Sequence, residues 1–294
     1  MTAYRQIGLI GAGRVAQALA LALAPHSAAP PLLWTRSPDK AQAAAARIGR
    51  AVAASRVEPL LAAADLLILA VSDDAVAAVT ADLAAALPAG HAPFAFHVSG
   101  RSGAAILSPL QAAGAATAAI HPAMTFTGDP EAEAYRMAQA RFAITGSTAA
   151  ATQQAAQIVA LLGGIAVEIA EERRALYHAG LCHASNHLVT LIAGAAHALT
   201  DAGVDDPAAL LAPLVRAALE NSLDRGFSAL SGPLLRGDAR TIGEHVETLA
   251  ANTPDLLPAY RAMALATLDE LDRLAPSDER HALRPALDSA RAVP

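Results

Sequence analysis

The sequence is poor in several residue types that would otherwise define a class of protein. Its 294 residues include one cysteine, Cys182, so neither an internal disulfide nor a cysteine-based metal site can form. The net charge of −6 offers no electrostatic reason to bind nucleic acid. Aromatic residues make up only 3%, whereas 54% of the chain is hydrophobic, a value inflated by alanine. This composition predicts a helix-rich soluble protein without a nucleic-acid partner.

Long apolar runs are also missing. Residues 188–199 come nearest to a membrane span, but they contain His197 and fall short of the roughly 18 uninterrupted apolar residues required. The N-terminus leads straight into a strand pattern, without the order of charged, apolar and small residues of a signal peptide. We therefore expect a cytoplasmic protein that does not bind membranes.

Lysine is almost absent, since Lys40 is the only one and all other basic residues are arginines. Arginine stays protonated at any working pH, whereas a lysine can be tuned to give and take a proton. A mechanism that requires a catalytic lysine would therefore depend on Lys40.

The pattern of elements divides the chain into two parts. Short strands alternate with helices up to Ile169, and the strand signals then stop. We predict the α/β class, with a doubly wound, Rossmann-type, mostly parallel sheet in residues 1–169. Residues 170–294 are predicted to form an all-α substrate and dimerisation domain.

A strand, a glycine turn and a helix open the chain. Residues 4–10 lead into Gly11-Ala12-Gly13, and apolar residues then recur at helical spacing as far as Pro25. Gly11 permits the turn, and Gly13 lets the backbone approach a pyrophosphate at the helix N-terminus. A purely structural glycine turn is the alternative. The residues predicted to bind a dinucleotide here are Gly11, Gly13, Arg14 and Val15.

The residues after the second strand indicate which dinucleotide is bound. An NAD-type site places an acidic residue roughly 20 residues after the glycines, to bind the ribose 2′-hydroxyl, but none occurs before Asp39. A guanidinium at Arg36 suits a 2′-phosphate, with Lys40 nearby. We therefore predict NADP, and the alternative is a solvated turn that opens the next helix. The binding residues predicted here are Thr35, Arg36 and Ser37.

Polar residues lie at the ends of three later predicted strands, which cover residues 65–71, 94–98 and 118–121. Ligands of doubly wound sheets bind beyond the carboxyl ends of the strands. These strand ends are therefore expected to line the cofactor and substrate crevice. The residues concerned are Val71, Ser72, Asp73, Ser99, Gly100 and His121.

The second half is predicted to contain a long helix over residues 171–200 and three further helices. These helices cover residues 207–223, with a kink or break at Pro213, then 238–250 and 254–274, before a short helix or loose tail from Pro276.

Two groups of polar residues on the long helix are candidates for chemistry. His178, Cys182 and Asn186 follow one another at intervals of four, so they share one helix face. They either face the nicotinamide or pack as ordinary polar residues. His183 and His187 form a second pair, but zinc needs a third ligand, so no metal is predicted.

A polar segment over residues 221–245 provides one more candidate. The Arg236 guanidinium could clamp a carboxylate on the substrate, or the segment could form plain turns with Asp238 as a helix N-cap.

With these motifs in view, the sequence resembles the bacterial proteins that join a Rossmann-like domain to an uncharacterised helical domain, commonly assigned as NADP-dependent oxidoreductases. It is more distantly similar to pyrroline-5-carboxylate reductase, deazaflavin-dependent NADP reductase, and the phosphogluconate and hydroxyisobutyrate dehydrogenases. The resemblance implies a homodimer in which the helical domain supplies the interface and part of the active site. Besides the glycine turn, its motifs are Tyr177-His178, Ala184-Ser185-Asn186, Ser231-Gly232-Pro233, and Arg236-Gly237-Asp238 with His245.

The sequence departs from the hydroxyacid dehydrogenases at one informative place. That branch uses a lysine a few residues before an asparagine of the long helix, but Cys182 and His183 precede Asn186 here. Reduction of an imine does not require that lysine. The leading hypothesis is an NADP(H)-dependent oxidoreductase acting on a small carbonyl or imine, and the candidate catalytic residues are Ser99, His121, His178, Asn186 and Arg236.

Two other functions remain open at this point. The lack of a recognisable catalytic lysine or acid–base pair suits a sensor or structural dimer that binds NADP(H) without turnover. Electron transfer to a flavin or deazaflavin partner would need an open apolar slot beside the nicotinamide.

Overall fold

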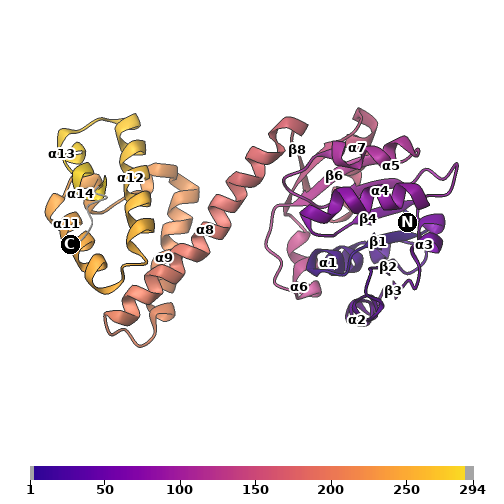
Figure 1. Cartoon of the computed structure of the whole chain (residues 1–294), viewed down its shortest axis with the longest axis horizontal. Coiled ribbons are helices and arrows are strands. Elements are labelled where there is room, and N and C mark those ends of the chain that lie inside the picture. Colours follow the sequence, from indigo (N-terminus) through magenta and orange to yellow (C-terminus); the bar gives the residue numbers. More distant parts are fainter. Residues whose placement is uncertain (1–2, 289–294) are drawn as a thin grey trace. The chain divides into compact units, whose positions relative to one another are not determined.

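The computed structural model describes residues 3–288 and consists of two compact units that divide between Cys182 and His183, within helix α8 (Figure 1). The first unit contains a sheet with helices on both faces, and the second is helical. The predicted domain boundary, between residues 169 and 170, directly follows the last strand and stays a prediction.

The first unit is built on one eight-stranded sheet of order β3-β2-β1-β4-β5-β6-β7-β8. The strands from β1 to β6 are parallel, β7 is antiparallel to β6, and β8 is parallel to β7. The order reverses beside β1, so the predicted doubly wound, mostly parallel α/β sheet is confirmed. The strands are β1 Ile7–Ile10, β2 Leu32–Trp34, β3 Val52–Ala53, β4 Leu66–Leu69, β5 Phe94–His97, β6 Ala116–Pro122, β7 Arg141–Gly146 and β8 Ile165–Glu168.

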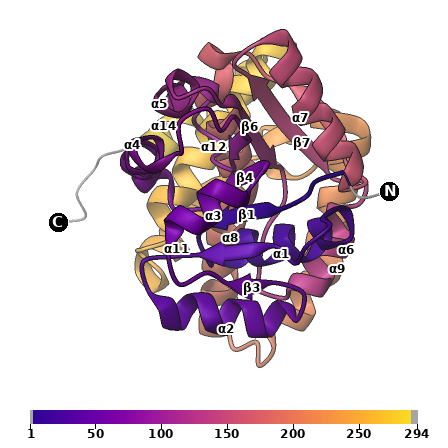
Figure 2. The ribbon, with the colours of Figure 1, turned by 90° about the vertical axis from the view of Figure 1, so that its right-hand side faces the viewer.

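Helices cover both faces of this sheet because its central strands are apolar on both sides. In β4, Leu66 and Ile68 join one core cluster, while Leu67 and Leu69 join another on the opposite face. Helix α2 runs along the β3 edge (Figure 2). The helices are α1 Arg14–Leu23, α2 Pro38–Ile48, α3 Val57–Ala63, α4 Val76–Ala86, α5 Ser108–Ala112, α6 Pro130–Met137 and α7 Ala149–Leu161. Of the elements in this unit, β3, α3, α5 and α6 were not predicted.

The second unit has a smaller core of its own, formed mainly by α11, α12 and α14 around Ile242, Leu268 and Leu287. The helices are α8 Arg174–Asp201, which begins in the first unit, α9 Pro207–Arg225, α10 Pro233–Arg236, α11 Ala239–Asn252, α12 Leu257–Leu274, α13 Asp278–His281 and α14 Arg284–Asp288. Short 3-10 turns are η1 Ala24–His26, η2 Asp73–Ala75, η3 Ala104–Leu107, η4 Glu171–Arg173 and η5 Gly226–Ala229. Within residues 3–288, no helix combines the length and the apolar character needed to cross a membrane.

The helical predictions are largely confirmed, with two corrections. Pro213 does not break α9, since the leucines and alanines on either side are strong helix formers that continue the hydrogen-bond ladder around the missing donor. Helix α12 begins at Leu257, because residues 254–256 form a turn ahead of it. Asp238 caps α11 as predicted, its carboxylate accepting the Thr241 N–H at 3.1 Å.

Candidate functional site

The glycine turn between β1 and α1 has room for a ligand on one side only. Gly11 has φ +119°, and a Cβ there would lie 2.2 Å from the Ala70 carbonyl oxygen, so only glycine fits. A Cβ on Gly13 would meet nothing within 4 Å. Gly13 therefore faces open space at the N-terminus of α1, where unpaired N–H groups favour an anion.

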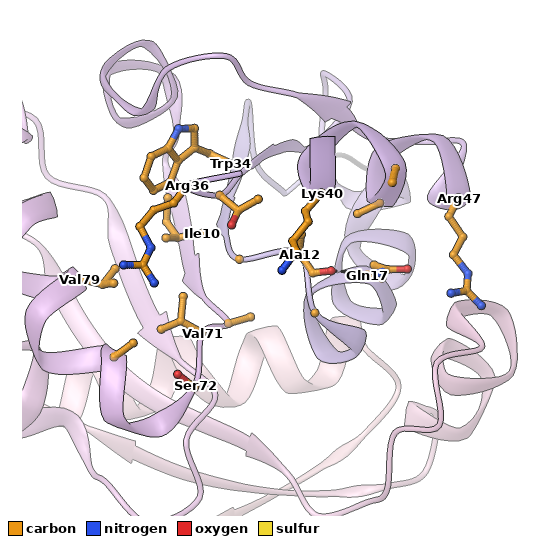
Figure 3. A pocket seen from close by; sticks show the side chains of 17 residues that line it. Ile10, Ala12, Gln17, Trp34, Arg36, Lys40, Arg47, Val71, Ser72 and Val79 are labelled. Carbon is orange, nitrogen blue, oxygen red and sulfur yellow. Dashed lines mark hydrogen bonds between the residues drawn. The ribbon is translucent and has the colours of Figure 1, made fainter. Parts of the chain in front are cut away.

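A pocket of about 550 Å³ opens beside this turn, within the usual size range of ligand sites. Its walls come from the carboxyl ends of β1, β2 and β4 and from α2 and α4 (Figure 3). This is the position that a doubly wound sheet offers to a nucleotide.

The charged side chains that line this pocket are all cations, namely Arg36, Lys40 and Arg47. Arg36 extends toward Val79, while Lys40 reaches toward Ala12 on another side of the pocket (Figure 3). Arg47 lies apart from both and donates a hydrogen bond to the Gly128 carbonyl oxygen. The pocket therefore suits a ligand that carries several phosphates.

About half of the predicted cofactor residues line this pocket, and the others do not. Arg14 instead donates to the Phe126 carbonyl oxygen at 3.1 Å, and Asp73 pairs with Arg101 at 3.7 Å. The predicted residues in the lining are Gly11, Gly13, Thr35, Arg36, Val71 and Ser72. Those outside it are Arg14, Val15, Ser37, Asp73 and Ser99. The sequence analysis missed Arg47 and named Lys40 only as a neighbour, since their spacing along α2 becomes informative only once the helix is placed.

A second group of residues gathers where β5 and β6 meet the start of α8. The Nδ1 atom of His121 lies 2.9 Å from the Tyr177 hydroxyl, and the two rings are nearly perpendicular, at 85°. The His178 ring lies 6.3 Å from the His121 ring, centroid to centroid. A Cβ on Gly100 would lie 2.6 Å from His178 and 2.9 Å from His121. Glycine at this position lets the loop after β5 pass against both imidazoles.

His97, at the end of β5, holds the backbone of that loop through two hydrogen bonds. It is fully buried, with Nε2 2.8 Å from the Gly103 carbonyl oxygen, while its Nδ1 accepts the Ser99 N–H at 3.0 Å. Nδ1 accepts, so the proton lies on Nε2 and the ring is neutral. Burial lowers the pKa of His97 to about 4. Sequence analysis missed His97 because it lies inside an apolar strand.

Arg174, in the first turn of α8, is a buried cation directly beside this group. Its side chain is 1% exposed and donates to the Thr145 hydroxyl at 2.8 Å and to the Ala119 and Ala143 carbonyl oxygens. In the described part of the chain no carboxylate forms an ion pair with it, and its Nη1 has no hydrogen-bond partner. Burial lowers the pKa of Arg174 to about 10, so it stays charged at neutral pH. The guanidinium carbon lies 6.0 Å from the centre of the Tyr177 ring.

These surroundings keep His121 neutral and Tyr177 protonated. Burial, with the positive charge of Arg174 as the second cause, lowers the pKa of His121 to about 4. Burial raises the pKa of Tyr177, and Arg174 opposes part of that shift. Of the predicted catalytic residues, the structure thus brings Ser99, His121 and His178 into one region. Sequence analysis did not assign Tyr177 a role in the site.

The other predicted catalytic residues, Asn186 and Arg236, belong to the helical unit. The Asn186 side-chain oxygen accepts a hydrogen bond from Ser185 at 3.0 Å, and Arg236 ends α10. His183 and His187 contact each other through Nδ1 atoms 3.0 Å apart. No cluster of three or more metal-ligating side chains occurs among residues 3–288.

Comparison with known families gives two matches that together cover most of the chain. Residues 2–122 match the Rossmann-like domain, and residues 140–267 match the domain of unknown function DUF2520. The fold and these matches define a Rossmann-type two-domain protein. The chain is thus similar to the Rossmann-like domain in its first part and to DUF2520 in its second, which is the domain arrangement that the sequence resembles. No curated protein matches the sequence.

Several solved structures share this fold over nearly the full length. A candidate NADP oxidoreductase from Bacteroides fragilis is 20% identical over 91% of this chain and 99% of its own, with a TM-score of 0.72. A Thermotoga maritima protein is 22% identical over 95% and 98%, with a TM-score of 0.64. A Plasmodium falciparum pyrroline carboxylate reductase with NADP bound is 13% identical over 98% and 100%, with a TM-score of 0.58. At these identities the likeness establishes the fold.

Proposed function

We propose that the protein is an NADP(H)-dependent oxidoreductase that transfers hydride between the nicotinamide and a small carbonyl or imine substrate. The observation that carries this proposal is the pocket at the glycine turn, whose charged side chains are all cations. The similar structures support the same chemistry, since they include an NADP oxidoreductase, a pyrroline carboxylate reductase with NADP bound and a reductive aminase in complex with NADPH.

The residues of the pocket fit the parts of NADP(H). The pyrophosphate would lie against Gly11 and Gly13 at the N-terminus of α1, where a side chain would obstruct it. Arg36 and Lys40 would hold the 2′-phosphate, the group that distinguishes NADP from NAD. The cofactor would supply hydride chemistry, while the protein binds and orients the reactants.

The proposed catalytic region lies at Ser99, His121 and His178, with Asn186 and Arg236 contributed by the helical unit. The catalytic roles of all five residues are proposals. The helical unit also carries exposed leucines and valines that suit a homodimer. In α8 and α9, the side chains of Val189, Leu214 and Leu223 are 68%, 66% and 78% exposed. A second copy of the chain would cover them.

Calorimetric titration with NADPH and NADH tests the cofactor assignment. We expect NADPH to bind more tightly, and Arg36→Glu to remove most of that preference by placing a carboxylate beside the 2′-phosphate. Arg50→Glu is the matched control, since Arg50 is exposed and lies outside the pocket. Equal affinity for both dinucleotides, unchanged by Arg36→Glu, would refute the assignment.

Turnover separates an enzyme from a sensor. Oxidation of NADPH in the presence of 2-oxo acids, ketones and cyclic imines should show a substrate for an oxidoreductase. If NADPH binds normally but no compound is reduced, and His178→Ala leaves binding unchanged, a non-catalytic sensor or structural dimer becomes the better account.

A further inference from the structure

The region around His121 has an unusual balance of charge. Arg174 is buried beneath it without a carboxylate partner among the described residues. Two acidic side chains act on this region through space, and both make other contacts. Asp73 pairs with Arg101 at 3.7 Å, and the Glu171 carboxylate lies against Gly103 and accepts the Ala105 N–H at 3.4 Å. Burial is the larger cause and lowers the pKa of Arg174, whereas Glu171 raises it, and neither carboxylate forms an ion pair with Arg174.

Burial and then Arg174 lower the pKa of His121, Asp73 is a smaller cause that raises it, and the groups that contact His121 are uncharged or cationic. His97, from β5, is neutral and uses both ring nitrogens in hydrogen bonds within its own loop. From α8, His178 and Tyr177 contact the His121 ring. Tyr177 carries the hydroxyl group that hydrogen-bonds to His121.

This charge balance distinguishes two kinds of substrate. Hydride transfer to a carbonyl builds negative charge on oxygen, which a nearby cation and a proton donor stabilise. An iminium ion is positive before it is reduced, so a neighbouring cation disfavours its binding and a negative group favours it. Arg174 opposes a proton on His121, and it would oppose a bound cation in the same place by the same electrostatic repulsion.

We propose, on the basis of the oxidoreductase function above, that this site reduces a carbonyl compound rather than an iminium ion and that Tyr177 supplies the proton to the carbonyl oxygen. The hydride, which carries both electrons, would come from NADPH. As the new C–H bond forms, the electron pair of the C=O π bond moves to oxygen. The Tyr177 O–H bond then breaks, and its proton forms an O–H bond on the product.

The contacts of Tyr177 suit this role. With its proton on Nδ1, neutral His121 donates to the Tyr177 oxygen and leaves the Tyr177 hydrogen free for the substrate. The phenolate that remains is stabilised by that N–H and by the charge of Arg174, and water then returns the proton. Arg174 acts through Tyr177 and His121 and is a positioning residue.

The substrate class is tested with ketones and cyclic imines of the same ring size and with one open-chain 2-oxo acid. We expect the full-length protein with NADPH to reduce cyclopentanone, cyclohexanone or pyruvate with a kcat/KM at least about 100-fold above those of 1-pyrroline and 1-piperideine. Reduction of the imines alone would overturn this inference and leave the proposed function intact. Reduction of none of them, with normal NADPH affinity, would count against the oxidoreductase itself.

Tyr177→Phe tests the proton donor, because it removes only the hydroxyl oxygen. We expect kcat for the ketone to fall about 100-fold or more, with KM and NADPH affinity nearly unchanged. Tyr260→Phe is the matched control, since its hydroxyl lies 2.9 Å from His245 in the helical unit. An unchanged kcat in folded Tyr177→Phe protein would overturn the assignment.

A measurement without turnover completes the test. The ultraviolet absorbance of tyrosinate is titrated in the wild type and in Tyr177→Phe, and the difference reports the ionisation of Tyr177. Arg174→Gln should move that ionisation to higher pH, and Arg174→Lys should largely restore it. If neither variant moves it, Arg174 does not act on Tyr177.

Discussion

The molecule contains the same pair of side chains twice, once in each unit. His121 and Tyr177 in the sheet unit, and His245 and Tyr260 in the helical unit, each have a histidine Nδ1 2.9 Å from a tyrosine hydroxyl. The ring planes meet at 85° and 82°. The surroundings differ, because Arg174 lies beside only the first pair and burial is deeper there. The same geometry therefore occurs in two different environments, and we propose that the loss of water and the neighbouring charge make the first pair reactive.

The two units also differ in how they bury apolar surface. The sheet unit has two core clusters, one on each face of the sheet. The helical unit has one small cluster, and large apolar side chains such as Leu223 are exposed on α8 and α9. A rigid sheet unit thus carries the dinucleotide pocket, while the helical unit retains the surface that we assign to a second copy.

The largest expected effect is on the glycine turn of the sheet unit. Gly11→Ala would place a Cβ 2.2 Å from the Ala70 carbonyl oxygen at a positive φ, so we expect a loss of several kcal/mol, at least about 3, and of NADPH binding. Trp34, the only tryptophan, lies in β2 and reports unfolding of this unit by fluorescence. Gly13→Ala, with open space around its Cβ, should change stability little. Equal stability of the two variants would contradict the geometry of the turn.

The buried histidines should make the sheet unit sensitive to acid. Because the pKa of His97 falls from 6.5 to about 4 on folding, the unfolded chain binds more protons between these pH values. Its contribution to stability is present above pH 6.5 and is lost as the pH falls toward 4, with a magnitude of about 3 kcal/mol. Urea unfolding followed by Trp34 fluorescence at pH 7 and pH 4.5 measures this difference in the free energy of unfolding.

Two variants identify the source of that acid sensitivity. His97→Gln keeps a donor for Gly103 but does not titrate, so the difference between pH 7 and pH 4.5 should shrink. His245→Gln, in the helical unit, should not change the difference in unfolding free energy between pH 7 and pH 4.5 that Trp34 reports. The reverse pattern would show that the pH dependence arises in the helical unit.

A smaller effect sharpens the contrast between the two histidine–tyrosine pairs. Arg174→Met should raise the pKa of His121, because Arg174 is the second cause of its depression, but the pKa should stay below 6.5 because burial is the first. Titration of the His121 ring protons by NMR measures the shift. An unchanged His121 titration in folded Arg174→Met protein would count against an effect of Arg174 on this pair.

The smallest effect concerns the helix caps. Thr148 caps α7 by accepting the Ala151 N–H at 3.1 Å, so Thr148→Ala should lower the stability reported by Trp34 by about 1 kcal/mol. Thr148→Ser should retain the cap. Asp238→Ala removes the equivalent cap of α11 in the helical unit, and the Trp34 transition should not move. If it moves as far as in Thr148→Ala, the two units unfold as one.

Much of the fold could be predicted because its signals are local. A few neighbouring residues are enough to predict the turn at Gly11 and Gly13, the strand β4 from its apolar run, and the start of α11 from its cap at Asp238. The kink at Pro213 stays a prediction, whereas a break there was wrong, because the neighbouring residues continue the helical hydrogen bonds. The element β3 was missed because two residues carry no periodic pattern.

Part of the candidate site followed from one rule of sheet topology. Ser99 and His121 lie at neighbouring strand ends, and parallel strands bring such ends to one edge. His97 and Arg174 were missed, since one resembles a core residue of a strand and the other an ordinary arginine near a helix start. The importance of each lies in burial and in the partners it reaches across the fold.

The order of its amino acids therefore determined that this chain forms a doubly wound sheet followed by helices, with a glycine turn suited to phosphates. Backbone geometry and apolar periodicity act over short distances, so they can be recognised in the sequence. The tertiary structure alone decided that Tyr177 contacts His121 and that Arg174 lies beside them, with no ion-pair partner among residues 3–288. Electrostatics inside a protein depends on distance through space and on the exclusion of water, and both arise only when distant segments pack together.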